Sequence, residues 1–120
     1  MTAPRLPAPS EHEEQVAFIR WWDLAHPGTL CHSIPNGGRR SMGVARKLKA
    51  EGVRPGIPDL MVPEYRLYIE FKRQRGGSLS AAQKTMIAHL ESIGYVVIVA
   101  KGAMDAIEQV TQYIQNYKQD

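Results

Sequence analysis

The sequence is poor in cysteine and in long apolar segments. Its 120 residues include one cysteine, Cys31, which excludes an intramolecular disulfide framework and a cysteine-based zinc site. No apolar run approaches the ~18–20 residues of a membrane span, and the N-terminus lacks the apolar core of a signal peptide. With 43% hydrophobic and 22% charged residues, the composition is typical of a soluble, intracellular globular protein.

Several kinds of catalytic or cofactor site are also missing. Serine and cysteine triads have no positional support. Gly37 and Gly38 precede two arginines, but no Gly-Lys-Ser/Thr motif follows, so we expect no nucleotide cofactor. The histidines lack the spacing of metal ligands, which disfavours zinc hydrolase chemistry: His12, His26, His32 and His89.

The net charge of +3 is unevenly distributed. The stretch 39–84 contains eleven lysines and arginines against four acidic residues, whereas the rest of the chain is acidic. A basic region of this kind attracts a polyanion, although solvated helix faces would give the same pattern.

Periodicity predicts one α/β domain over residues 10–120, in which helices flank a mixed sheet, preceded by a proline-rich flexible arm over residues 1–9. Ser10 and Ser80 are expected to cap two of the helices. The apolar strand 95–100 is expected to be central in the sheet. The predicted order is α-β-α-β-β-α-β-α, with helices over 10–25, 42–50, 81–93 and 104–117 and strands over 29–34, 56–62, 67–72 and 95–100.

The middle pair of strands is the most informative part of the sequence. The turn-forming residues 63–66 join two short apolar runs, which predicts a β-hairpin. If the loop closes evenly, Val62 faces Leu67 and Asp59 faces Glu70, where like charges repel. Lys72 lies on the same face as Glu70, because side chains alternate along a strand. Two carboxylates and an ammonium group therefore converge at one end of the hairpin.

This convergence of charged side chains has two interpretations. Folding gains little from opposed carboxylates, whereas hard cations such as Mg²⁺ bind carboxylate oxygens and keep positions open for water and phosphate. The alternative is a plain Pro-Asp turn beside a solvated Glu-Lys pair on an edge strand. For each residue alone the alternative is favoured, but the three together match a known pattern.

Pro58-Asp59, followed after ten residues by Glu70-Phe71-Lys72, resembles the PD-(D/E)XK nuclease signature. The flanking segments 35–40, 56–57 and 79–84 make the whole similar to the virus-type replication-repair nuclease (VRR-NUC) domain, in the small stand-alone form found in phages and prophages. The resemblance runs from about Glu11 to about Tyr113. It implies a restriction-endonuclease-like core and a location in the cytoplasm of a bacterium or of a phage-infected cell.

The resemblance also implies roles for individual residues. Asp59, Glu70 and the backbone carbonyl of Phe71 would hold Mg²⁺ or Mn²⁺, and Lys72 would orient or deprotonate the attacking water. Gln83 would contact phosphate or order water. An acid on the first helix would approach the metal, and either Glu11 or Glu14 fits that position; acids in a first helical turn also simply complement the helix dipole.

The expected function is metal-dependent hydrolysis of DNA. The resemblance to the stand-alone proteins further implies that the substrate is branched DNA, such as a Holliday junction, and that a homodimer cuts it. The alternatives are a non-catalytic DNA-binding module on a nuclease fold and a restriction- or toxin-type nuclease. Residues expected to contact DNA lie in two glycine-rich loops and on nearby helices: Asn36, Gly37, Arg39, Arg40, Arg46, Lys47, Arg73, Arg75 and Lys84.

Overall fold

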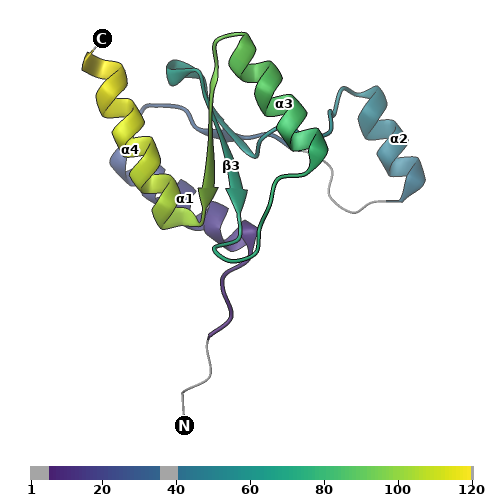
Figure 1. Ribbon diagram of the computed structural model, residues 1–120, viewed down its shortest axis with the longest axis horizontal. Helices are drawn as coiled ribbons and strands as arrows, with labels where there is room; N and C mark the ends of the chain where they lie inside the picture. Colours follow the sequence, from purple (N-terminus) through teal and green to yellow (C-terminus); the bar gives the residue numbers. More distant parts are fainter. Residues whose placement is uncertain (1–5, 36–40, 120) are drawn as a thin grey trace.

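The computed structural model describes residues 6–35 and 41–119 (Figure 1). The observed order of elements is the predicted α-β-α-β-β-α-β-α order, with one added 3₁₀ turn in the hairpin loop. None of the helices in these ranges has the length and apolarity to cross a membrane. The elements are α1 (Glu11–Ala25), β1 (His32–Ser33), α2 (Met42–Ala50), β2 (Leu60–Val62), η1 (Pro63–Tyr65), β3 (Leu67–Lys72), α3 (Ala81–Ser92), β4 (Val96–Lys101) and α4 (Ala103–Gln119).

The sheet has the strand order β1-β2-β3-β4. β2 and β3 form the predicted antiparallel hairpin, in which Val62 pairs with Leu67 and Leu60 pairs with Ile69. β4 runs parallel to β3, and the helix α3 makes the crossover between them. The mixed α/β fold predicted from the sequence is therefore confirmed.

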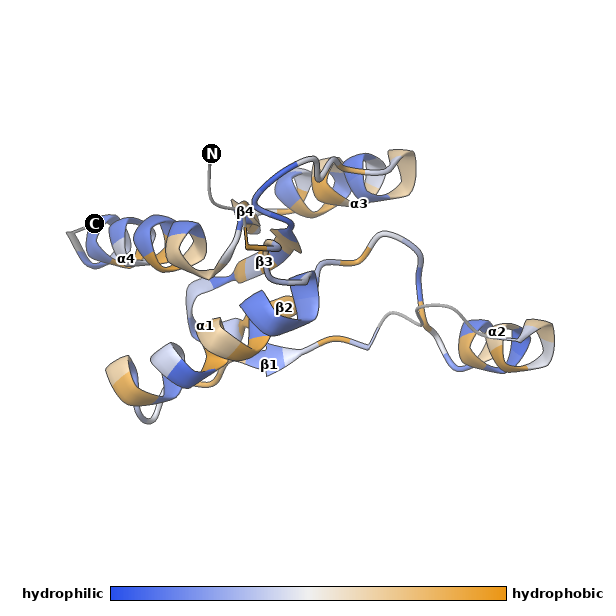
Figure 2. Ribbon diagram, turned by 90° about the horizontal axis from the view of Figure 1, so that it is seen from below, coloured by the Kyte–Doolittle hydropathy of each residue, from blue (hydrophilic) through white to orange (hydrophobic). Residues whose placement is uncertain are grey.

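One face of the sheet holds the apolar core. α1 and α4 lie together on this face, and α3 lies on the opposite face (Figure 2). Phe18 on α1 packs edge-on against Phe71 of β3, with the ring centroids 5.6 Å apart. Val110 and Ile114 of α4 are buried in the same cluster. This face supplies most of the burial that stabilises the domain.

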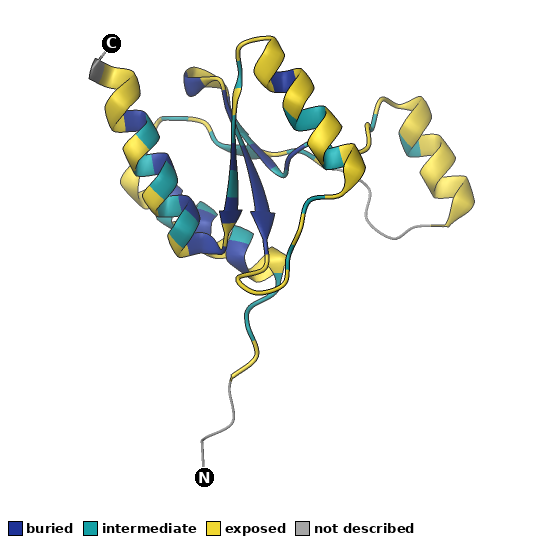
Figure 3. Cartoon of the chain, in the orientation of Figure 1, coloured by how far each residue is buried: buried dark blue, intermediate teal, exposed yellow. Residues whose placement is uncertain are grey.

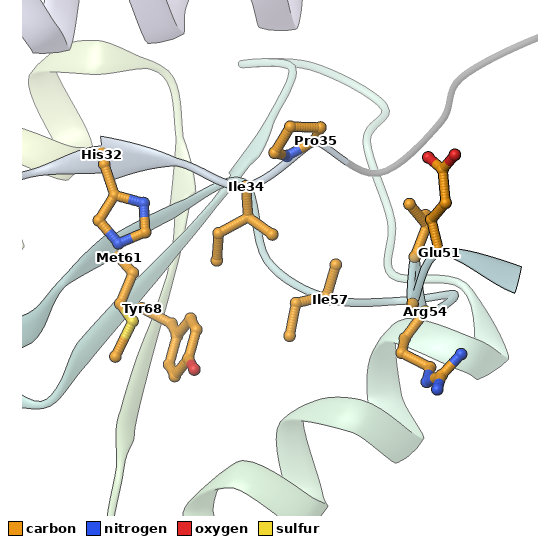
Figure 4. A pocket seen from close by; sticks show the side chains of 10 residues that line it. His32, Ile34, Pro35, Glu51, Arg54, Ile57, Met61 and Tyr68 are labelled. Atoms are coloured by element: carbon orange, nitrogen blue, oxygen red, sulfur yellow. The ribbon is translucent and has the colours of Figure 1, made fainter. Parts of the chain in front are cut away.

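The opposite face is only partly covered. α3 packs over the β4 side, while the β1–β2 side borders an apolar cleft of about 420 Å³ (Figure 4). The cleft is lined by Ile34, Ile57, Met61 and Tyr68, among others. The helix α2 lies well away from the rest of the domain and has no buried residue (Figures 2 and 3).

Three predictions about strands were wrong. The strand expected over 56–62 begins only at Leu60, because the chain at Gly56 has a positive φ and lies against α3 instead of pairing with another strand. The strand expected over 29–34 is reduced to His32–Ser33, because only these residues pair with β2. The strand expected to be central lies at an edge of the sheet. Its outer edge is covered by side chains of α4 rather than by another strand: Gln109 donates to the Val99 carbonyl, and Asp105 accepts from the Lys101 N–H. β4 is apolar on both faces because α4 packs near one face and α3 packs on the other.

The segment before β2 passes very close to the first turn of α3. Gly56 has φ +82°, and a Cβ at this position would overlap the carbonyl group of Ala82. The absence of a side chain therefore lets the chain, three residues before Asp59, lie against the helix turn that carries Gln83. Gly76 also has a positive φ, +77°, but nothing lies within 4 Å of the position of its Cβ.

We predict that Gly56→Ala lowers the free energy of unfolding more than Gly76→Ala does. Both substitutions strain a left-handed backbone, at roughly 1–2 kcal/mol. Only Gly56→Ala adds a clash with backbone, and overpacking of this kind costs about a further 1–3 kcal/mol. Urea denaturation of the two variants measures the difference. Equal losses would show that the contact between the 56–59 segment and α3 is unimportant.

Candidate active site

The predicted residues Asp59, Glu70 and Lys72 come together at one end of the hairpin. Asp59 directly precedes β2, and its main chain extends the pairing of this strand, since the Ile34 N–H donates to the Asp59 carbonyl at 2.8 Å. The Phe71 N–H donates to Asp59 Oδ2 at 2.7 Å. This hydrogen bond fixes the carboxylate next to the backbone of β3.

Glu70 is almost fully buried, with 2% of its surface exposed. Burial, a hydrogen bond with the Asp59 carboxyl and the negative charge of Asp59 together raise the pKa of Glu70 to about 9. The positive charge of Lys72 acts in the opposite direction. In the absence of a cation, the pair of carboxyl groups therefore binds one proton, which lies between Asp59 and Glu70.

Gln83 connects the two charged residues of β3. Its side-chain Nε2 donates to Glu70 Oε1 at 2.9 Å, and its Oε1 accepts from Lys72 Nζ at 2.9 Å. The same oxygen accepts from the Ser80 N–H, so Gln83 forms a capping box with Ser80 as the third residue of α3. The amide is thereby held in one orientation, and Lys72, 8% exposed, has a fixed direction.

The two candidate acids of α1 differ in their surroundings. Glu11 is exposed, and its charge contributes to the raised pKa of Glu70, which places Glu11 near the carboxyl pair. Glu14 is buried and accepts a hydrogen bond from Gln74 Nε2 at 3.0 Å. Of the two acids, Glu14 is therefore held by Gln74, whereas Glu11 lies within electrostatic range of the carboxyl pair.

Three of the residues expected to contact DNA lie close to this end of the sheet. Arg73 and Arg75 are exposed in the loop after β3, and Lys84 is exposed on the first turn of α3. Arg46 and Lys47 lie on the separate helix α2. Four of the predicted residues lie outside the described ranges: Asn36, Gly37, Arg39 and Arg40.

Two features of the site were not anticipated. Lys101 pairs directly with Lys72 in the parallel register of β3 and β4, so it stands beside the candidate active site and is exposed. Nothing in the sequence signals this neighbour, because the register of strands joined by a helix depends on tertiary packing. The bond between Glu14 and Gln74 also joins segments that are far apart in the sequence.

The donor set suits a hard divalent cation. Two carboxylates and the adjacent Phe71 carbonyl offer oxygen atoms only, and a cation would take the place of the shared proton. Within residues 6–35 and 41–119, no group of three or more His, Cys, Asp or Glu side chains is arranged to hold a metal. A small protein donor set fits Mg²⁺, which retains several of its water ligands.

We predict that Glu70→Gln stabilises the metal-free protein, and more at pH 8 than at pH 5. The raised pKa means that the unfolded chain loses the Glu70 proton near pH 4.5, whereas the folded chain keeps it up to about pH 9. Glu70 therefore lowers the free energy of unfolding increasingly as pH rises between these values. Between these values the difference grows by at most about 1.4 kcal/mol for each pH unit. Thermal unfolding in EDTA measures the effect, and an equal shift at both pH values would contradict it.

Comparison with known proteins agrees with this geometry. The family model described as "VRR-NUC domain" matches residues 9–104. A solved structure described as "VRR_NUC domain protein" is 29% identical, with a TM-score of 0.75 and coverage of 92% of both chains. A search of curated proteins finds none that matches. The chain therefore belongs to the VRR-NUC domain family and has a nuclease-type fold.

Proposed function

We propose that this protein is a metal-dependent endonuclease that hydrolyses DNA phosphodiester bonds. The observation that carries the proposal is the carboxyl pair of Asp59 and Glu70, held beside the ammonium group of Lys72 by Gln83. Burial and repulsion make this arrangement costly for folding. A site for a cation and a phosphate accounts for it.

In this proposal Asp59, Glu70 and the Phe71 carbonyl hold Mg²⁺ or Mn²⁺, with Glu11 in an outer position. The cation, when bound, supplies Lewis-acid stabilisation of the phosphate. The Lys72 ammonium, aimed by Gln83, orients the attacking water and stabilises the negative charge that develops on the phosphate oxygens. If Lys72 also takes the proton from the water, it must first be in its neutral form.

DNA would approach along the basic side of the domain. Arg73, Arg75 and Lys84 surround the candidate active site as exposed side chains, and the stretch 39–84 has a clear excess of positive charge. Phosphate contacts of this kind give affinity without sequence specificity. The resemblance to stand-alone VRR-NUC proteins adds the proposal that the enzyme is structure-selective, acting on branched DNA such as Holliday junctions in the cytoplasm.

We predict cleavage with Mg²⁺ or Mn²⁺ and none with EDTA. Linear, flapped and four-way DNA substrates, each tested with both metals, define the preference. Asp59→Asn and Lys72→Met should abolish turnover and retain DNA binding, because they remove the cation ligand and the ammonium group while keeping side-chain size. If the folded wild-type protein binds DNA but cleaves none of these substrates, the chain is a binding module instead.

The proposed assembly is a two-fold homodimer, since a junction needs two cuts. Its support is a pair of surfaces that one copy leaves open: the apolar cleft beside β1 and β2, and the helix α2, on which Val44 is 41% exposed. An isolated nine-residue helix is marginal in water, so α2 requires a tertiary contact. Exchange of α2 between two copies would cover both surfaces in a closed dimer.

We predict that the molar mass measured by light scattering is that of a dimer, both without DNA and with a bound four-way DNA junction. Val44→Glu should shift the protein to a monomer, because the charge would enter the apolar contact. Lys49→Glu, a charge change at another exposed position on the same helix, serves as the control and should remain dimeric. A wild-type protein that is monomeric in both conditions would contradict the junction-resolving dimer without affecting the nuclease assignment.

A further inference from the structure

Glu14 occupies a position where a packing residue is expected. It shares one face of α1 with Phe18 and Trp22, at the i, i+4, i+8 spacing, and both of these are fully buried in the core. Glu14 itself is only 5% exposed. Burying a carboxylate is costly, whereas an aliphatic residue here would extend the core. The carboxylate therefore needs a reason beyond packing.

The surroundings of Glu14 form a built site for its carboxylate. Gln74 Nε2, from the loop after β3, donates to Glu14 Oε2 at 3.0 Å. Gly102, at the junction of β4 and α4, has φ +98°, and a Cβ there would overlap Glu14 Oε2 and lie 2.9 Å from Gln74 Cγ. The N-terminus of α4 follows at once and favours a negative charge. Three distant segments thus meet at one carboxylate.

The contact acts on the part of the chain that leaves the candidate active site. Gln74 is two residues beyond Lys72, at the carboxyl end of β3. The same loop folds back on the strand, so that a Cβ at Gly77 would lie 3.1 Å from Lys72 Cβ and 3.0 Å from the Arg73 nitrogen. Holding Gln74 therefore fixes the backbone from which the Lys72 and Arg73 side chains project.

We propose that Glu14 is a positioning residue: through Gln74 it clamps the loop 73–77 against α1 and the β4–α4 junction, and so fixes the backbone from which Lys72 reaches Gln83. This inference rests on the proposed nuclease function. It separates the two acids of α1, with Glu14 holding the loop and Glu11 left for the outer position near the carboxyl pair. Gly102 is the third part of the clamp, because a side chain there would occupy the place of the carboxylate.

The test is a reciprocal exchange of the two side chains. Gln74→Glu places two carboxylates together, so it should lower kcat by roughly ten- to a hundredfold, as small misplacements of catalytic groups do. Adding Glu14→Gln restores an amide–carboxylate hydrogen bond in the opposite direction, and should return kcat to within about threefold of wild type. Ser78→Glu, an exposed position in the same loop, adds equal charge away from Glu14 and should change only KM.

A metal ligand would behave differently from a clamp. If Glu14 bound the cation, Glu14→Gln alone would raise the concentration of Mg²⁺ needed for half-maximal rate, and the double variant would be worse than either single variant. Either result overturns the proposal. The proposal is also overturned if the wild-type protein is active and the Gln74→Glu variant has the same kcat.

A second measurement does not depend on catalysis. Hydrogen exchange of the amides in 73–77, in metal-free protein whose thermal unfolding shows it to be folded, should become faster in Gln74→Glu and return towards wild type in the double variant. Unchanged exchange in Gln74→Glu would overturn the clamp. If the wild-type protein cleaves no DNA while exchange follows this pattern, the nuclease function fails and the clamp itself stands.

Discussion

The carboxylates of Asp59 and Glu70 depend on the register of one hairpin. The pairing of Val62 with Leu67 places the end of β2 beside the end of β3, and a shift by one residue would move these acids to opposite faces of the sheet. The buried residues Leu60 and Ile69 fix that register, because they must face the core. Apolar packing on one face thus holds two like charges together on the other.

Gln83 makes this end of the sheet compatible with a folded protein. Its amide satisfies Glu70 and Lys72 at the same time, while its capping hydrogen bonds tie it to the first turn of α3. Helix formation and side-chain orientation are therefore coupled. Gly56 contributes from the other side, since its lack of a side chain brings the segment before Asp59 against the same helical turn.

The two faces of the sheet differ in the residues that they bear. The face covered by α1 and α4 is apolar and closely packed around Phe18 and Phe71. On the face that bears Glu70 and Lys72, α3 packs over the β4 side and the first turn of α3 brings Gln83 onto both residues. α1 contributes both to the core and to the surroundings of the candidate active site, because its core-facing side begins with Glu14 and its exposed first turn carries Glu11. A rigid core element thus supports the residues proposed for catalysis.

The sequence by itself determined the order of elements, the hairpin register and the grouping of Asp59, Glu70 and Lys72, since alternation and turn residues act over short distances. Only tertiary structure decided that β4 lies at the edge of the sheet and that Lys101 stands beside Lys72. It also separated the surroundings of Glu11 from those of Glu14. Such relations join segments distant along the chain, and local patterns carry no information about how those segments pack.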